Sequence, residues 1–427
     1  MSGNGSNGFW PTLSLAERDR RWKAVRAEMV AQGIDCLVVS GDQGNWGGNM
    51  ANPRYLTGIG DRGFAIFPKE GEPALLTWWI GPYKIRQRTH TDALTKTILA
   101  KAKKRQKLPN PWRLEAPWIR DLRQAGPLWS KQIIRTIKDF GYERGTIGMV
   151  GTSQDWEPEG LFPYTTLQNL RKGLPRATIV EDVTWIIEKQ RLRKSPEEIA
   201  CHQKAADIAD VGIETIKEVA RAGVSELKVY SAIVQRMLEA GSERYLMIFW
   251  ESGPTPTHVA LYQPLDRPLL KGDLICDEIT PRYAGYVAHP HQPVCVGKPM
   301  KEYQQMFELL KGAFLKAMET LKPGVTVGKI EDLLTVPLRE KGYSYVHCPF
   351  HGLGLSGLEQ PTARFGSHAP MVPSPRRLKF EEGMVIALEP MISTGDQKIG
   401  IPLGDTVVVT ADGCRGMSRY ARDIIIV

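Results

Sequence analysis

The sequence predicts two domains, an α/β domain at the N-terminus followed by an α+β domain. The chain has 427 residues, more than one hydrophobic core usually supports, and 42% of them are hydrophobic, which is enough for two cores. Helix and strand patterns alternate up to about residue 190, as in an α/β layer. A new helix start at Ser195 separates the two parts, so we expect domains over residues 1–190 and 195–427.

The N-terminal pattern begins with apolar residues at helical spacing over 14–33, and Asp35 then opens a run typical of a buried strand. The segment 109–129 contains four prolines and three tryptophans, and we expect a long loop there. Three further strands are expected at residues 63–68, 73–79 and 145–150.

The C-terminal part opens with a strong helix signal. Ser195 can cap the helix, Pro196 suits its first position, and Glu198 completes a capping box. The remaining patterns predict helices flanking an antiparallel sheet. The helices are expected at 225–240, 301–321 and 327–341, and the strands over 246–297 and near Met384, Thr406 and Asp423.

Composition limits the function classes. No apolar run approaches the roughly 20 residues of a membrane span, and the first eight residues are mostly Gly, Ser and Asn, so we expect neither secretion nor membrane insertion. The six cysteines stand singly, which suits reduced thiols in the cytoplasm. The net charge of +9 and the lysine-rich residues 101–107 suggest nucleic-acid binding, but no nucleic-acid fold is recognisable. We therefore expect a solvated basic surface rather than a nucleic-acid site, and a small anionic substrate fits the same charge balance.

The candidate site residues lie in the second domain, which carries six of the eight histidines beyond its opening helices. His289 and His291 are two residues apart on a strand-like segment, so both imidazoles are expected on one face. Taken alone, the spacing is better explained by half-buried or surface histidines without a ligand role. Glu278 precedes His289 by eleven residues on the neighbouring strand pattern. Glu389 ends an apolar strand, where burial requires a cation or donor, unless the side chain is exposed at the strand end.

His351 begins the motif His-Gly-Leu-Gly-Leu, in which glycines permit close backbone approach. A histidine in a glycine-rich turn without further function is the simple alternative. The motif therefore indicates a functional site only if other candidate ligands lie close to His351.

Five motifs together resemble successive signatures of the pita-bread family, which includes creatinase, prolidase and aminopeptidase P. The N-terminal α/β domain is also similar to that of creatinase and prolidase. The resemblance implies a creatinase-like N-terminal domain and a pita-bread catalytic domain. In chain order the motifs are Lys194-Ser-Pro-Glu-Glu-Ile199, Gly272-Asp-Leu, Tyr283-x-Gly-Tyr286, His351-Gly-Leu-Gly-Leu and Glu389-Pro390.

The resemblance implies a dinuclear site built from two aspartates, a histidine and two glutamates, and this chain departs from that set. His351 and Glu389 match, whereas Glu278 stands at the first aspartate, His289 at the second and Gly404 at the last glutamate. The bridging pair of carboxylates is thus absent.

Two histidines that assist peptide cleavage in the aminopeptidase members are also replaced, by Leu261 and Leu358. Each such loss removes a hydrogen-bond donor or a proton-transfer partner. We therefore expect that the chain is not a conventional Xaa-Pro peptidase.

Two versions of the chemistry remain open. His289, His351 and Glu389, with Glu278 and His291 nearby, can hold one divalent ion (Zn, Mn or Fe) with an open position for water or substrate. Alternatively no metal is bound and a histidine acts as acid or base near a carboxylate, as the resemblance to creatinase implies. In both versions His351, Glu389, His289 and Glu278 are the expected catalytic residues.

The expected function is that of a creatinase-like hydrolase or lyase that cleaves a C–N bond, less readily a C–S or C–O bond, in a small charged molecule. One alternative is a non-catalytic pita-bread binding module. Another is a metallo-aminopeptidase with displaced ligands, which needs a carboxylate in place of Gly404; the adjacent Asp405 should point to the opposite strand face.

Resemblance to creatinase also implies a homodimer in which the neighbouring N-terminal domain closes the site. Residues 55–64 resemble the substrate-contacting segment, and within them Arg62 is expected to bind a substrate carboxylate, with a solvated arginine in a turn as the alternative. His291 and His258 are the other expected substrate-binding residues.

Overall fold

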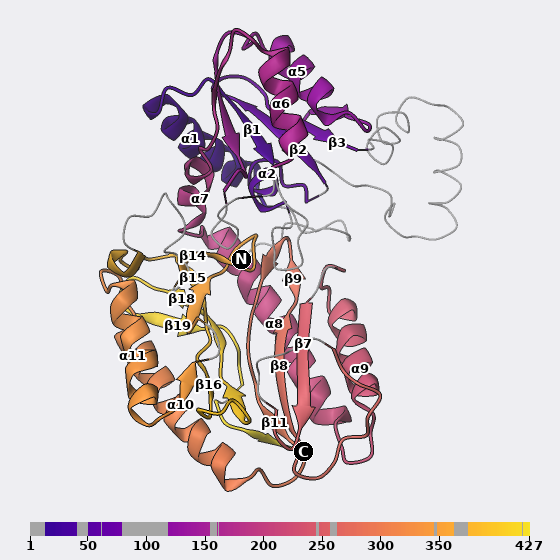
Figure 1. Ribbon diagram of the computed structural model, residues 1–427, viewed down its shortest axis with the longest axis vertical. Helices are drawn as coiled ribbons and strands as arrows, with labels where there is room; N and C mark the ends of the chain where they lie inside the picture. Colours follow the sequence, from indigo (N-terminus) through magenta and orange to yellow (C-terminus); the bar gives the residue numbers. More distant parts are fainter. Residues whose placement is uncertain are drawn as a thin grey trace, which may run out of the picture. The chain divides into compact units, whose positions relative to one another are not determined.

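The computed structural model describes residues 13–40, 50–60, 62–78, 118–153, 160, 162–244, 247–256, 263–345, 348–362, 375–420 and 422–427 (Figure 1). The chain forms two compact units, Met1–Gln190 and Arg191–Val427, and each is described by itself. Among the described residues, no helix has both the length and the apolar character needed to cross a membrane.

The N-terminal unit is built on a six-stranded mixed sheet with the order β4-β3-β2-β1-β5-β6. Strand β1 pairs with β2 in antiparallel and with β5 in parallel orientation. Helices α5 and α6 pack on one face of this sheet through a shared apolar core. The strands are β1 (Cys36–Ser40), β2 (Gly63–Pro68), β3 (Ala74–Thr77), β4 (Asp121–Gln124), β5 (Thr146–Val150) and β6 (Thr178–Val180), and the helices α1 (Leu15–Ala31), α2 (Ala51–Thr57), α5 (Trp129–Asp139), α6 (Tyr164–Gly173) and α7 (Trp185–Arg191).

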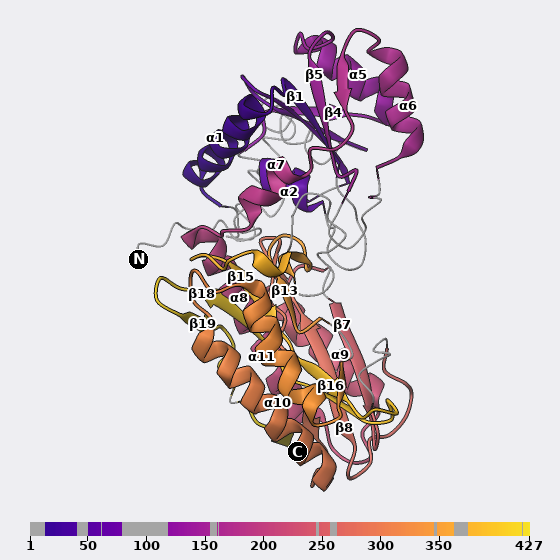
Figure 2. The same cartoon turned by 60° about the vertical axis from the view of Figure 1, so that its left-hand side comes forward.

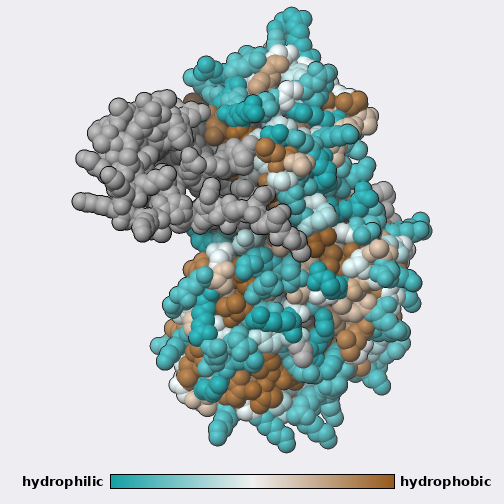
Figure 3. Space-filling model, turned by 180° about the vertical axis from the view of Figure 1, so that it is seen from behind, coloured by the Kyte–Doolittle hydropathy of each residue, from teal (hydrophilic) through white to brown (hydrophobic). Residues whose placement is uncertain are grey.

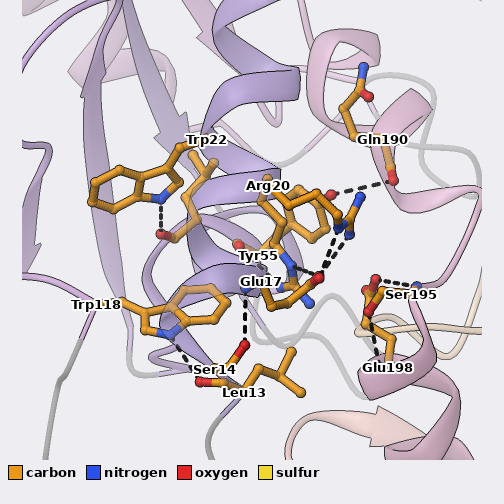
Figure 4. Close-up of polar contacts among 12 residues, drawn as sticks. Leu13, Ser14, Glu17, Arg20, Trp22, Tyr55, Trp118, Gln190, Ser195 and Glu198 are labelled. Atoms are coloured by element: carbon orange, nitrogen blue, oxygen red, sulfur yellow. Dashed lines mark hydrogen bonds and ion pairs between the residues drawn. The ribbon is translucent and has the colours of Figure 1, made fainter.

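The first helix is held by side-chain to backbone contacts at its start (Figure 4). The hydroxyl of Ser14 accepts the amide hydrogen of Glu17 at 3.1 Å, which caps the helix. Glu17 in turn forms an ion pair with Arg20, and the indole nitrogen of Trp22 donates to the carbonyl of Leu56 at 2.8 Å. These contacts fix α1 against the end of α2.

The predicted helix over 14–33 and the strands of this unit are confirmed to within a few residues. The prediction of a long loop over 109–129 is wrong where it can be compared, because 121–124 form β4 and Trp129 begins α5. Strand β4 pairs in parallel with β3, so sheet pairing outweighs the prolines that flank it. The rest of that segment up to 117, and residues 101–107, lie outside the described residues.

The C-terminal unit packs four long helices around sheets whose strands pair in antiparallel orientation, except for β11 and β20, which pair in parallel. Helices α8 and α9 share one apolar core, and α10 and α11, which lie side by side in Figures 1 and 2, share another. The predicted capping box is confirmed: the Ser195 hydroxyl accepts from the amide of Glu198, and the Glu198 carboxylate accepts from the amide of Ser195 (Figure 4). The helices are α8 (Pro196–Val219), α9 (Glu226–Glu239), α10 (Lys301–Thr320) and α11 (Val327–Glu340).

Two sheets of this unit carry the residues of the candidate site. The four-stranded sheet has the order β20-β11-β8-β7, and the five-stranded sheet the order β14-β13-β15-β18-β19. A three-stranded sheet, β12-β16-β17, and the hairpin β9-β10 complete the unit. The bounds are β7 (Met247–Gly253), β8 (Leu274–Thr280), β9 (Arg282–Tyr283), β10 (Tyr286–Val287), β11 (Val294–Cys295), β12 (Ser344–Tyr345), β13 (Phe350–Gly352), β14 (Glu359–Thr362), β15 (Val385–Leu388), β16 (Met391–Ser393), β17 (Gly400–Pro402), β18 (Asp405–Val409), β19 (Cys414–Gly416) and β20 (Ile425–Ile426), with a short 3-10 helix at Pro375–Arg377.

Strand β8 lies between the two cores. Leu274 and Cys276 point into the core shared with α10 and α11, whereas Ile275 and Ile279 point into the core shared with α8 and α9. By alternation, Glu278 lies on the face of Leu274 and Cys276.

On the outside, hydrophilic side chains cover much of the face seen in Figure 3, with smaller hydrophobic areas between them.

A buried ion-pair network ties the start of this unit to β14. Both oxygens of Glu359 are engaged, one by the guanidinium of Arg191 and the other by the ammonium of Lys194 at 3.2 Å. Burial alone would raise the pKa of Glu359, but the charges of Arg191 and Lys194 outweigh it and lower this pKa to about 2. Burial also lowers the pKa of Lys194, although the charge of Glu359 opposes this shift. The ion pair between Glu359 and Arg191 is therefore the stronger of the two, because the guanidinium keeps its charge.

We predict that Glu359→Ala lowers the free energy of unfolding by about 3–5 kcal/mol at pH 7, because it leaves two buried cations without their partner. The folded-state pKa is depressed, so the contribution is present above about pH 4.5 and disappears as the pH falls toward 2. Urea unfolding at pH 7 measures the loss of unfolding free energy, and urea unfolding at decreasing pH measures its pH dependence. The matched control is Glu381→Ala, which breaks the exposed pair with Arg193 and should cost below about 1 kcal/mol. Equal losses in the two variants would contradict the prediction.

Candidate metal centre

Five buried side chains from four segments of the C-terminal unit converge on one place. Glu278 lies in β8, and His351 lies in β13. His289 and His291 follow β10, and Glu389 comes directly after β15. Each of the five residues is at most 4% exposed.

The carboxylate of Glu389 is at the centre of the group. Its Oε2 lies 3.0 Å from Nε2 of His289 and 2.9 Å from Nε2 of His291, and its Oε1 lies 3.0 Å from Nε2 of His351. The second carboxylate approaches from β8, with Glu278 Oε1 3.0 Å from Nε2 of His289 and Oε2 4.0 Å from Nε2 of His291. All three imidazoles therefore turn the same ring nitrogen toward carboxylate oxygens.

The other ring nitrogen shows which tautomer two of these histidines adopt. Nδ1 of His291 lies 2.9 Å from the carbonyl oxygen of Asp277, and Nδ1 of His351 lies 3.0 Å from that of Gly352. A carbonyl oxygen only accepts, so Nδ1 carries the hydrogen and donates it. In the neutral rings Nε2 then bears a lone pair that faces a carboxylate oxygen. Two electron-rich atoms 3 Å apart require a positive charge close to both.

The geometry around His289 also favours a cation over a hydrogen bond. Among the described residues, neither Nε2 of His289 nor Oε1 of Glu278 has a hydrogen bond of good geometry, although the two buried atoms are 3.0 Å apart. The backbone amide of His289 donates to the hydroxyl of Thr406 at 2.8 Å, and Nδ1 lies 3.4 Å from the hydroxyl of Thr280. These two contacts engage the backbone amide and Nδ1 of His289, so its Nε2 remains available to a metal ion.

The electrostatics of the centre show how strongly it attracts positive charge. Burial by itself lowers the pKa of His289, but the negative charges of Glu278 and Glu389 outweigh it and raise this pKa to about 10. Burial likewise opposes ionisation of Glu389, yet the charges of His351 and His289 hold its pKa well below the usual range. Two carboxylates among neutral imidazoles carry a charge of −2, which one divalent ion neutralises.

The donor atoms fit a transition-metal ion. Ligand atoms of His289, His351 and Glu389 lie within 4.8 Å of one another, and so do those of Glu278, His289 and His291. Imidazole nitrogens with carboxylate oxygens suit zinc, iron and manganese, and ligating histidines usually donate their second N–H to a backbone carbonyl or carboxylate. His291 and His351 make that second contact.

We predict that Zn²⁺ at about one hundred times its dissociation constant stabilises the metal-stripped protein by about 2.7 kcal/mol. The isosteric variant Glu389→Gln should lose most of this gain, because the amide removes the charge that all three imidazoles face. Thermal unfolding with and without Zn²⁺ measures the effect, and Glu381→Gln, at an exposed carboxylate, is the control. The same zinc-induced shift in wild type and Glu389→Gln would contradict this assignment.

The structure brings His289 and His291 together as the HxH spacing predicts, but for another reason. The segment is not a regular strand, and His291 forms only an isolated bridge with Gly404. The alternative that Glu389 is exposed at a strand end is wrong, since the residue is 1% exposed. Asp405 points away from the centre, as expected, and its carboxylate pairs with Arg422 at 2.7 Å.

The other predicted residues are not part of the described cluster. Arg62 is exposed directly before β2 in the N-terminal unit, and a substrate-binding role for it stays a prediction. His258 and Leu261 lie outside the described residues. Leu358 is half-buried between β13 and β14.

Sequence reasoning missed the threonines that support His289. Thr280 is two residues beyond Glu278 in β8, so strand alternation places both side chains on one face and could have revealed it. Thr406 lies in β18, far along the chain, and no local signal connects it with His289.

Comparison with known proteins gives matches to two family models. The model of the creatinase/prolidase N-terminal domain matches residues 21–193, and that of metallopeptidase family M24 matches residues 200–411. The chain is 28% identical over 276 residues to a Xaa-Pro dipeptidase of Pyrococcus horikoshii, which covers 62% of this chain and 74% of the relative. It is 28% identical over 294 residues to an uncharacterized peptidase of Bacillus subtilis, and this match covers 68% of this chain and 77% of the relative.

Solved structures share the fold. A Xaa-Pro dipeptidase from Bacillus anthracis superposes with a TM-score of 0.72 at 20% identity, covering 96% of this chain and 100% of that one. An X-Pro aminopeptidase from Thermotoga maritima gives a TM-score of 0.72 at 19% identity, covering 95% and 99%.

Fold and site together define a two-domain hydrolase with a buried imidazole and carboxylate centre in its second domain. The chain belongs to the pita-bread family of creatinase, prolidase and aminopeptidase P.

The function expected from the altered ligands is wrong. We expected cleavage of a C–N bond in a small charged molecule, with a binding module or a metallo-aminopeptidase with displaced ligands as alternatives, whereas several relatives are Xaa-Pro dipeptidases and point to a peptidase. The error has a physical origin. Loss of the bridging carboxylates weakens a two-ion mechanism, but a single ion with three protein ligands also supports peptide hydrolysis.

Proposed function

We propose that this protein is a metal-dependent peptidase that hydrolyses short peptides at a single-ion centre. The observation that carries the proposal is the buried group His289, His351 and Glu389, whose ligand atoms lie within 4.8 Å of one another. Two histidines and one glutamate are also the ligand set of known zinc peptidases, in which a fourth position stays open.

Within this proposal Glu389 is the anchor of the centre, because its two oxygens face Nε2 atoms of three histidines. The backbone amide of His289 donates to Thr406 while its Nδ1 faces Thr280, and Nδ1 of His351 donates to the carbonyl of Gly352, so the Nε2 atoms of both rings are preorganised. A bound divalent ion would supply a Lewis acid for the oxygen of the scissile carbonyl.

Glu278 is the proposed general base and acid. Its Oε1 makes no hydrogen bond, although it is buried beside His289, so it can accept the proton of an attacking water. The same oxygen can then return that proton to the leaving amine. Its position on β8, opposite the strands that carry His351 and Glu389, brings it to the centre from a separate sheet.

The substrate class follows from the relatives, several of which are Xaa-Pro dipeptidases. We propose Xaa-Pro dipeptides as substrates, with the guanidinium of Arg62 as a candidate partner for the C-terminal carboxylate. A homodimer and a cytoplasmic location are part of this proposal.

Proline release from a panel of Xaa-Pro dipeptides tests the proposal directly. The metal-stripped protein is reloaded with Zn²⁺, Mn²⁺ or Co²⁺, and we expect turnover with at least one ion on the order of 1–10³ per second. His351→Ala should reduce turnover to background because it removes a ligand. Wild-type protein that binds the ions but releases no more proline than His351→Ala with any of them would contradict the proposal.

We further predict that Glu278→Gln lowers kcat by about 10²–10⁴, since an amide cannot accept the proton, while the zinc content per chain stays unchanged. The matched control is Glu381→Gln, the same isosteric change at an exposed carboxylate outside the centre. It should retain kcat within about threefold. A glutamine variant with the kcat of wild type would exclude Glu278 as the base, and loss of zinc in that variant would make it a ligand instead.

A further inference from the structure

Position 404 has no room for a side chain while the imidazole of His291 is in place. A Cβ atom on Gly404 would lie 2.6 Å from Cδ2 of His291 and 3.2 Å from Cβ of Glu389. The two chain segments are locked together by reciprocal backbone hydrogen bonds, from His291 to Gly404 and from Gly404 to His291, both 3.1 Å long. The imidazole of His291 therefore fills the space through which a side chain at 404 would reach the centre.

The ring of His291 is oriented in the way of a metal ligand. Its Nδ1 donates to the carbonyl oxygen of Asp277 at 2.9 Å, and its Nε2 lies 2.9 Å from Oε2 of Glu389. The residue is 1% exposed, so Nε2 of the ring and the carboxylate of Glu389 face each other away from bulk water. A ring fixed at one nitrogen by a backbone carbonyl and turned toward anionic oxygens with the other is preorganised for a cation.

The shared use of His289 limits the number of ions. The two groups able to hold an ion, Glu278 with His289 and His291, and His289 with His351 and Glu389, both depend on that residue. A carboxylate can bridge two ions with its two oxygens, but Nε2 of an imidazole has one lone pair. Nδ1 of His289 cannot serve a second ion in the same place, since it faces Thr280 at 3.4 Å.

We propose that His291 is a metal ligand that takes the place of a side chain at position 404 and binds the same ion as His289, His351 and Glu389, so that water takes a fifth position. Because both groups depend on His289, the centre then holds one ion per chain. The inference deepens the proposed function and rests on the same centre, but it does not depend on the substrate. The predicted substrate-binding role of His291 is replaced by a ligand role. His291 and Gly404 then form a matched pair, in which the ring is useful only because the glycine leaves room for it.

Zinc titration of the metal-stripped full chain by calorimetry, with elemental analysis of the loaded protein, tests the proposal. Wild type should take up one Zn²⁺ per chain. His291→Phe, which keeps a ring but no nitrogen, and His291→Ala should each raise the dissociation constant at least tenfold. His202→Ala is the control, because it also truncates a buried imidazole bound to a carbonyl, that of Val287 at 2.7 Å, and should change the constant by less than about threefold.

The reciprocal change makes the test specific for the pair. Gly404→Glu alone should weaken zinc binding, because its Cβ collides with the ring of His291. The double variant His291→Ala/Gly404→Glu should bind zinc more tightly than His291→Ala, because the new carboxylate enters the vacated space. This nonadditivity is the signature of two residues that share one position.

Several results would overturn the proposal. They are unchanged zinc affinity in His291→Phe, two ions bound to wild type, or additive effects in the double variant. Circular dichroism establishes that each variant is folded, and His291→Phe keeps the test valid if His291→Ala does not fold. A protein that binds zinc as expected but hydrolyses no peptide would reject the proposed function and leave this inference intact.

Discussion

Two carboxylates are buried among three imidazoles in the second domain, and their negative charge has to be compensated inside the protein. Glu278 and Glu389 are 4% and 1% exposed, so solvent does not perform that compensation. The tautomers of His291 and His351 leave lone pairs, not protons, between rings and carboxylates when the rings are neutral. The cluster therefore favours binding a cation. The surrounding strands bury it, so water does not reach its carboxylates to stabilise their charge.

The fold provides this arrangement through the registers of separate strands. His351 pairs opposite Ala387 across β13 and β15, and Leu388 pairs opposite Asp405 across β15 and β18. These pairings bring Glu389, Gly404 and Thr406 next to one another. Glu278 arrives on β8 of another sheet, and His291 crosses between them through its bridge to Gly404. A shift of one residue in either register would turn a ligand to the opposite face.

Much of this could be predicted from the sequence. The helices followed from apolar periodicity and from the capping box at Ser195, and the strand ends that carry Glu278 and Glu389 followed from apolar runs. The contribution of Thr406 and the fit between His291 and Gly404 could not be predicted, because both depend on contacts between segments far apart in sequence. The functional expectation failed because the missing ligands and histidines were taken to exclude peptide hydrolysis, whereas several relatives of the chain are peptidases.

The most direct test of this account is X-ray absorption spectroscopy of the zinc-loaded protein at the zinc edge. We expect one first shell of nitrogen and oxygen atoms at about 2.0–2.1 Å, with the outer-shell scattering typical of several imidazole ligands. No metal neighbour should appear at the separation of about 3.5–4 Å found in two-ion sites. A zinc–zinc distance in that range, or a first shell made of oxygen without imidazole scattering, would contradict a single ion bound by histidines.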